Sequence, residues 1–162
     1  MQIENIHSRK IEANKSQIVD LLRTLSTKQD KVWPHEKWPR MKFKDGLKLG
    51  AVGGHGPIAY DVQSYDLDRE IIFRFLAPKG FNGVHKFEIK EFNNQEVEVK
   101  HTIAMTTSLE GSIKWITFVR PLHDALIEDA FDKIETHVSD KQLETPWSNY
   151  VKVLRYFLKY II

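Results

Sequence analysis

The hydrophobic positions between Ile113 and Val138 recur at three- and four-residue spacing, which predicts one long amphipathic helix. Its apolar face consists of Leu122, Ala125, Leu126, Ile127, Ala130, Phe131 and Ile134. Five acidic residues occupy most of the remaining surface and are expected to face water: Asp124, Glu128, Asp129, Asp132 and Glu135. Because an apolar face this wide has to pack against another element, we expect the upstream chain to wrap around this helix.

The start of this helix allows two interpretations. Ser112 is a candidate N-cap, and Pro121 removes a backbone donor, so we expect a kink or a break at the proline. In the alternative interpretation, the segment Ile113 to Val119 forms a last strand and the helix begins after it.

Alternation of apolar and polar positions predicts that strands dominate the preceding chain. A first strand from Gln2 to Glu12 is followed by a short helix from Lys15 to Thr24. Further strands are expected at Leu47 to Gly53, Pro57 to Tyr65, around Ile71 to Phe75, Val84 to Phe92 and Gln95 to Thr106. The first two of these are joined by a predicted turn, Gly53-Gly54-His55-Gly56. Hairpin connections throughout indicate an antiparallel sheet.

Two further segments carry large apolar side chains. Trp33 and Trp38 expose too much apolar surface to remain in water, so we expect them to fold over one end of the core. A second amphipathic helix is predicted from Pro146 onward, with an apolar stripe at Trp147, Tyr150, Val151, Leu154, Leu158 and Ile161. We therefore divide the chain into a domain at residues 1–140 and a helical extension at 141–162 that packs on it.

Composition excludes several classes of function. The chain has 162 residues, 24 basic and 22 acidic side chains and a formal net charge of +2, which argues against a nucleic-acid-binding protein. The absence of cysteine excludes thiolate chemistry and cysteine-ligated metals, and it suits a reducing cytoplasm. The N-terminus lacks the apolar run of a signal peptide, and no segment approaches the roughly 20 apolar residues of a membrane span. We expect a soluble cytoplasmic protein.

The order of elements resembles the SRPBCC superfamily, which includes START-like domains, birch-pollen-allergen-like proteins and the polyketide cyclase/dehydrase families. The resemblance covers residues 2–138 and rests on IHSRKIEANKSQIVDLLRTL near the front and RPLHDALIEDAFDKI near the back. Within the superfamily the chain looks most like the uncharacterised bacterial members. The resemblance implies an α+β helix-grip fold, a curved antiparallel sheet of about seven strands around a long C-terminal helix. It also implies a cavity that binds hydrophobic small molecules, and in a minority of members catalyses cyclisation or dehydration.

Sequence motifs for metals and cofactors are missing, and we expect neither. His35-Glu36 begins like a zinc-protease motif, but Pro39 stands where the second histidine is needed. The glycines of GAVGGHG, residues 50–56, lie between antiparallel strands with no helix following, so they do not form a dinucleotide fingerprint. No Gly-x-Ser-x-Gly elbow of a hydrolase is present.

Histidines and aromatic residues are the candidate ligand-binding side chains. His85 and His101 occupy the apolar phase of neighbouring strands. Three roles are open for them: part of the core, orientation of a polar ligand group, or general acid and base catalysis. Tyr60 can add a hydroxyl, and His123 faces either the cavity or the helix surface. The candidate set is Trp33, Trp38, Tyr60, Phe73, Phe75, His85, Phe87, His101, Met105 and His123.

Three functions remain open. The first is binding or carrying of a hydrophobic small molecule, such as a lipid, polyketide or aromatic compound. The second is a cyclase- or dehydratase-type enzyme that uses the pocket histidines His85 and His101. The third is a protein-interaction module whose terminal helix makes a partner contact, for example in a homodimer.

Overall fold

The computed structural model describes residues 1–139 and 141–158. Along the chain its elements are β1 (Gln2–Ile11), α1 (Lys15–Leu22), β2 (Lys42–Phe43), β3 (Val52–His55), β4 (Ile58–Asp66), β5 (Glu70–Ala77), β6 (Phe81–Asn93), β7 (Glu96–Thr107), α2 (Leu109–Lys114), the π-helical turn η1 (Trp115–Val119), α3 (Arg120–Val138) and α4 (Asn149–Leu158). None of the helices within these residues is long and apolar enough to cross a membrane.

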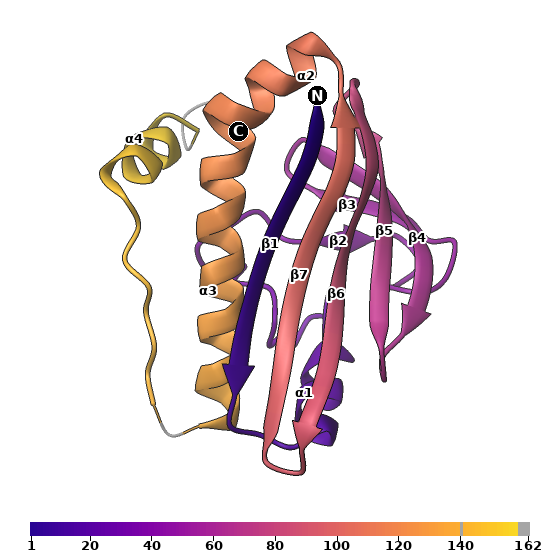
Figure 1. Ribbon diagram of the computed structural model, residues 1–162, viewed down its shortest axis with the longest axis vertical. Coiled ribbons are helices and arrows are strands. Elements are labelled where there is room, and N and C mark those ends of the chain that lie inside the picture. The colour runs from indigo at the N-terminus through magenta and orange to yellow at the C-terminus, as the bar shows by residue number, and fades with distance from the viewer. Residues whose placement is uncertain (140, 159–162) are drawn as a thin grey trace.

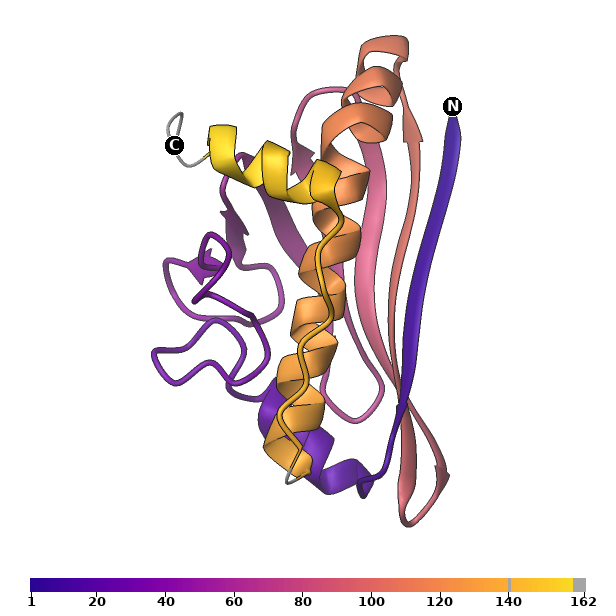
Figure 2. The same cartoon turned by 90° about the vertical axis from the view of Figure 1, so that its left-hand side faces the viewer.

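The seven strands form one antiparallel sheet in the order β1-β7-β6-β5-β4-β3-β2. The sheet curves around α3, which lies along its concave side (Figures 1 and 2). The inner face of α3 is fully enclosed, since Ala130, Phe131 and Ile134 are all 0% exposed. The predicted helix-grip fold is therefore confirmed.

The long helix begins earlier than predicted and is interrupted in an unexpected way. Ser108, rather than Ser112, is the N-cap, and its hydroxyl accepts a hydrogen bond from the backbone N–H of Gly111. Residues 113–119 are helical, so the strand interpretation is wrong. In η1 the N–H of Arg120 bonds to the carbonyl of Trp115, five residues back. This wider turn lies directly before Pro121, and the ribbon changes direction there (Figure 1).

The glycine-rich segment forms a strand where a turn was expected. Gly53 and Gly54 belong to β3, and the turn follows at Gly56, whose φ is +51°. A Cβ atom at Gly53 would lie 2.3 Å from the carbonyl oxygen of Lys42 and 2.5 Å from the ring of Phe43. Glycine is needed here because β2 packs directly against this strand, and composition alone made the segment look like a loop.

The acidic residues of α3 are predicted to face water, but two of them are buried. Asp129 is 4% exposed and Asp132 is 5% exposed. Asp132 accepts hydrogen bonds from Arg9 at 2.5 Å and from the backbone N–H of Thr145 at 2.5 Å. Asp129 is enclosed by the segment that contains Trp38 and by Trp147. Both carboxylates are buried because distant parts of the chain supply donors to them.

The C-terminal helix begins at Asn149, three residues later than predicted, and Pro146 lies in the extended segment before it. It crosses the N-terminal part of α3 (Figure 2). Val151 is its buried residue, and the hydroxyl of Tyr150 donates to the carbonyl of Thr117 at 2.6 Å. The predicted stripe position Ile161 lies outside the described residues.

Candidate ligand-binding cavity

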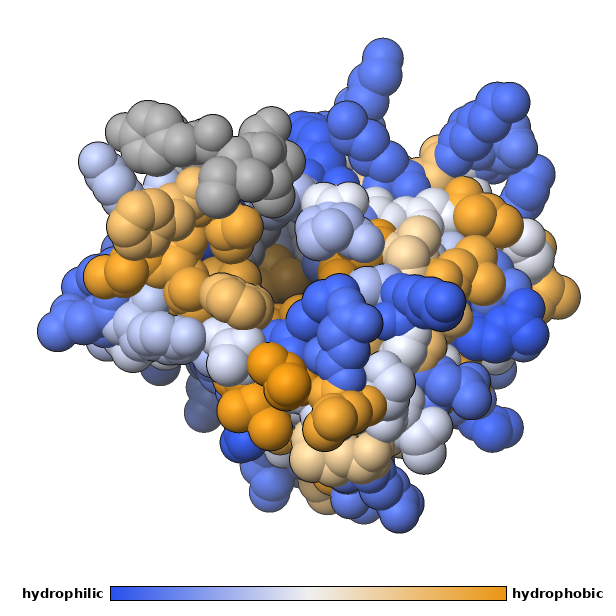
Figure 3. All heavy atoms as spheres, turned by 90° about the horizontal axis from the view of Figure 1, so that it is seen from above, coloured by the Kyte–Doolittle hydropathy of each residue, from blue (hydrophilic) through white to orange (hydrophobic). Residues whose placement is uncertain are grey.

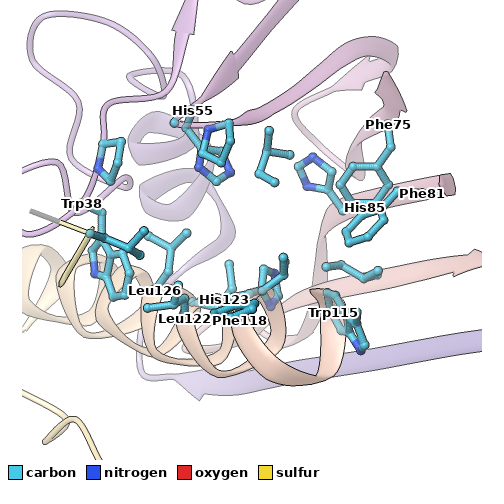
Figure 4. Close-up of a pocket in the computed structure, with 18 of the residues that line it drawn as sticks. Trp38, His55, Phe75, Phe81, His85, Trp115, Phe118, Leu122, His123 and Leu126 are labelled. Carbon is cyan, nitrogen blue, oxygen red and sulfur yellow. The ribbon is translucent and has the colours of Figure 1, made fainter. Parts of the chain in front are cut away.

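A cavity of about 220 Å³ lies between the concave face of the sheet and the η1–α3 helix. Figure 4 shows aromatic and aliphatic side chains from both sides directed into this space. Seen from the end of the molecule where α2 lies, hydrophobic side chains gather around a hollow (Figure 3). The six predicted site residues that line the cavity are Trp33, Trp38, Phe75, His85, His101 and His123.

The other predicted site residues form the layer behind the wall. The ring of His85 packs against Tyr60 at 4.8 Å and Phe73 at 4.7 Å between centroids. Phe87 holds His101 in the same way, with centroids 4.7 Å apart. These three aromatic residues are no more than 1% exposed and do not line the cavity. They therefore fix the orientation of the two histidines.

Met105 also lies outside the cavity. It belongs to a smaller core cluster with Ile3, Phe81 and Trp115 at the end of the sheet near α2. Its side chain is 4% exposed and supports this end of the wall from behind. Its assignment as a ligand-binding residue stays a prediction.

Several lining residues were not among the predicted site residues. His55 follows the glycines of β3 and belongs to the segment from Gly53 to Gly56 that the sequence pattern predicts as a turn. Trp115 and Phe118 come from the helical segment whose secondary structure was ambiguous in the sequence. Arg155 belongs to the face of α4 that the sequence pattern assigns to solvent. Each depends on a local conformation or a long-range contact that periodicity does not reveal.

His85 and His101 face each other across neighbouring strands, with His85 Nδ1 3.4 Å from His101 Nε2. The register pairs His85 with Ile103 and Phe87 with His101, so the two imidazoles lie diagonally on the same face. Burial, and secondarily the other nearby histidines, lowers the pKa of both imidazoles well below 6.5. Both rings are therefore neutral at physiological pH.

The outer nitrogens of this pair, His85 Nε2 and His101 Nδ1, are buried and bond to no other described residue. A neutral imidazole carries one N–H and one lone pair. Whichever ring donates in the contact between them, the pair is left with one outward donor and one outward acceptor. The pair can thus bind a group that both accepts and donates a hydrogen bond.

Two more histidines extend the polar part of the cavity wall. The ring of His123 on α3 lies 4.9 Å from that of His101, and neither of its nitrogens has a hydrogen-bond partner among the described residues. Burial lowers the pKa of His123, and it lowers the pKa of His55, which packs 4.7 Å from Trp33, to about 3. All four cavity histidines are therefore held in the uncharged form.

Behind His123, an ion-pair network joins β1 to α3. His7 bonds through Nδ1 to Glu128 at 2.8 Å and through Nε2 to Asp124 at 3.0 Å. The hydrogen bond to Asp124 raises the pKa of His7, since contact with two carboxylates requires both ring nitrogens to carry protons. Arg9 donates to Glu128 at 2.7 Å in the same network.

The structure also brings together one set of atoms with the composition of a metal site. His7, His123 and Asp124 place ligand atoms within 4.8 Å of one another. However, both nitrogens of His7 are already engaged by carboxylates, and His123 Nδ1 is 3.7 Å from Asp124 Oδ1. This geometry is accounted for by the ion pairs between β1 and α3, and we assign no metal to it.

Arg155 lies at the opposite end of the cavity from His85. Its guanidinium carbon is 4.6 Å from the centre of the Trp38 ring, and one terminal nitrogen donates to the carbonyl of Lys37. Its Nε is buried without a hydrogen-bond partner, and within residues 1–139 and 141–158 it has no ion-pair partner within 4.0 Å. Burial lowers the pKa of Arg155, yet it stays charged at neutral pH.

Comparisons with known proteins identify the fold. No protein-family model matches the sequence, and a search of curated proteins finds no significant match. A solved structure from Thermobifida fusca is similar to the chain with a TM-score of 0.66 and 12% identity, covering 90% of this chain and 99% of the other.

Two further solved structures carry informative names. A START superfamily protein from Mycobacterium smegmatis matches with a TM-score of 0.54 and 12% identity, covering 85% of this chain and 97% of the other. A norcoclaurine synthase mutant from Thalictrum flavum, in complex with a transition-state analogue, matches with a TM-score of 0.59 and 11% identity, covering 86% and 99%. The chain therefore has the START-like helix-grip fold that these proteins share.

Proposed function

We propose that this protein binds a small hydrophobic molecule in the cavity between the sheet and α3. The observation that carries the proposal is an apolar cavity of about 220 Å³ whose wall includes three uncharged histidines with unpartnered nitrogens, His85, His101 and His123. Small-molecule sites have this composition, a mostly apolar wall with a few polar groups that orient the ligand. A cavity that served packing alone would not enclose unsatisfied polar atoms, each of which costs about 1–3 kcal/mol.

The comparisons support the proposal at the level of fold. Norcoclaurine synthase was solved with a transition-state analogue, so this fold accommodates a ligand in at least one similar structure. We also propose, from the sequence, that the chain is a bacterial member of the SRPBCC superfamily and that it acts in the cytoplasm.

A fluorescent probe tests the proposal directly. The two-ring compound 1-naphthylamine should bind the wild-type protein with a blue shift of its fluorescence, and Leu126→Phe should weaken its binding at least about tenfold because the added ring fills the cavity. The matched control is Leu76→Phe, since Leu76 is 48% exposed and lies outside the cavity. Circular dichroism verifies that both variants are folded. Equal binding by all three proteins, with no retained ligand in native mass spectrometry, would exclude the proposal.

A second candidate function is catalysis of the cyclase or dehydratase type. The observation that favours it is the 3.4 Å contact between His85 and His101. In such a step the outer nitrogen of one ring accepts a proton, a second proton passes from that ring to the other ring, and the outer N–H of the other ring gives up a third proton. The pair can thus act as base and acid in one step. Variants His85→Gln and His101→Gln that still bind the probe but abolish turnover would support catalysis, and absence of turnover by the wild type would oppose it.

A third candidate is an interaction module formed by α4, for example in a homodimer. Val153 and Phe157 on this helix are 51% and 58% exposed, and Phe118 on η1 is 53% exposed. Light scattering of the wild type and of a Val153→Ser/Phe157→Ser variant tests this role. A dimer that becomes a monomer in the variant supports it, and a wild-type monomer excludes self-association.

A further inference from the structure

This inference rests on the proposed function and specifies the class of ligand. We infer that the cavity takes a small cyclic carboxylic acid with a hydroxyl or carbonyl group at its far end, the carboxylate binding Arg155 and the far group binding the His85–His101 pair.

The volume limits the ligand to one or two rings. The cavity holds about 220 Å³. An engineered apolar cavity of about 150 Å³ binds benzene, whereas drug-sized ligands occupy about 300–1,000 Å³. A sterol or a long-chain lipid is therefore too large, and a compound such as a phenylpropanoic acid has the required size. The walls suit a flat ring because Phe75 and Phe81 line the space on the sheet side and Trp115 lines it on the helix side (Figure 4).

The inner end of the cavity selects an uncharged polar group. His85 and His101 are 5% and 2% exposed, and both are neutral, so they offer no positive charge to a buried anion. They do offer one hydrogen-bond donor and one acceptor, at His85 Nε2 and His101 Nδ1. A hydroxyl group uses both, and a carbonyl group uses the donor. The charged part of an amphipathic ligand therefore belongs at the other end.

The outer end supplies the charge. Figure 4 places Trp38 at one end of the cavity and His85 at the other. The Arg155 guanidinium lies over Trp38, and its Nε has no hydrogen-bond partner among the described residues. The carboxylate whose charge acts on Arg155, Asp129, is occupied by the indole nitrogens of Trp38 and Trp147 and by the ammonium group of Lys37. Arg155 thus brings a positive charge and one unpartnered N–H to this end of the cavity, and a carboxylate is the group that guanidinium binds best.

Isothermal titration of the full chain with three matched compounds tests the inference. The probe is 3-(4-hydroxyphenyl)propanoate, and the two comparison compounds are 3-phenylpropanoate, which lacks the ring hydroxyl, and 3-(4-hydroxyphenyl)propan-1-ol, which lacks the charge. We expect the probe to bind most tightly, with a loss of about five- to tenfold for removal of the hydroxyl and at least about tenfold for removal of the carboxylate.

Variants assign each effect to its residue. Arg155→Gln should weaken binding of the two acids at least about tenfold and leave binding of the alcohol unchanged. Lys152→Gln is the matched control, because it removes one positive charge from an exposed position of the same helix. His101→Phe should abolish the advantage of the hydroxyl without weakening 3-phenylpropanoate. If His101→Phe does not fold, His85→Gln provides the same test.

The outcomes separate this inference from the proposed function. Equal affinity for the three compounds, tighter binding of the alcohol, or preference for a long-chain fatty acid such as hexadecanoate overturns the inference. If 1-naphthylamine still enters the cavity in that case, the proposed function stands. If neither the naphthylamine nor any of the three compounds binds, both the inference and the proposed function are wrong.

Discussion

The indole nitrogen of Trp38 donates a hydrogen bond of 2.7 Å to Oδ2 of Asp129, a residue 91 positions later in the chain. Trp147 donates to the same oxygen at 2.8 Å, and Lys37 donates to the other carboxylate oxygen at 3.0 Å. One buried carboxylate on α3 therefore holds the loop before β2 and the segment before α4. Since Trp38 and Arg155 line the cavity, this contact also fixes its outer end.

Removal of the Asp129 carboxylate should be strongly destabilising. Asp129→Ala leaves the buried indole donor of Trp38 and the partly buried one of Trp147 without an acceptor, and we expect it to lower the free energy of unfolding by about 3 kcal/mol. Urea denaturation measures the change. The control is Asp20→Ala, whose side chain is 70% exposed and forms only a surface ion pair with Arg23, so its effect should stay below about 0.5 kcal/mol. Similar losses in the two variants would contradict this account.

Acidification should destabilise the protein before its carboxylates are protonated. Burial lowers the pKa of His85 and His101 in the folded state, whereas the unfolded chain has the ordinary value near 6.5. Below that value the unfolded state binds more protons than the folded state, so the stability present above pH 6.5 is lost as the pH falls. Each such histidine contributes up to about 1.4 kcal/mol per pH unit. Denaturation curves at pH 7.5, 6.5 and 5.5 measure the loss.

Variants distinguish this effect from a general one. His101→Phe cannot be protonated and should reduce the loss between pH 6.5 and 5.5 by about 1 kcal/mol. His137→Gln changes an exposed histidine and should leave the loss as in the wild type. His7 acts in the opposite direction, because its raised folded-state pKa gives stability below pH 6.5 that is lost as the pH rises past that pKa. The same loss of stability between pH 6.5 and 5.5 in the wild type and in His101→Phe would show that burial does not hold His101 neutral.

The sequence predicted the fold class and part of the site, because both depend on short-range periodicity. Two-residue alternation places His85 and His101 on the inner face of adjacent strands, and three- and four-residue spacing marks the buried face of α3. Superfamily resemblance added the curvature of the sheet around that helix. These features can be predicted even where the predicted ends of an element are wrong by one or two residues.

Other features depend on contacts between distant segments and could not be predicted. Asp129 looks solvent-exposed in the sequence because its donors, Trp38 and Trp147, come from two other segments. Arg155 lies opposite the apolar stripe of its own helix, yet it lines the cavity because α4 crosses α3. His55 was missed because glycines that permit close strand packing have the same composition as glycines in a turn.

The close packing of β2 against β3 gives a prediction about Gly53. An added methyl group at this position would meet the carbonyl oxygen of Lys42 at 2.3 Å, so Gly53→Ala must displace β2 and should cost about 2 kcal/mol of stability. Probe binding should weaken as well, because β3 places His55 in the cavity wall. Val52→Ala is the neighbouring control, since Val52 is 60% exposed. A fully stable Gly53→Ala protein would mean that β2 and β3 are not packed this closely.

The packing of α4 on the rest of the chain can be tested with two valines of the same helix. Val151 is 4% exposed and Val153 is 51% exposed. If residues 141–162 pack on the domain as proposed, Val151→Ala should lower the free energy of unfolding by about 2 kcal/mol, because it removes two buried methyl groups and leaves a space behind. Val153→Ala should change it by less than about 0.5 kcal/mol. Because α4 supplies Arg155, Val151→Ala should also speed release of the naphthylamine probe, measured by stopped-flow fluorescence. Equal stability and equal release rates for the two variants would show that α4 is not a wall of the cavity in solution.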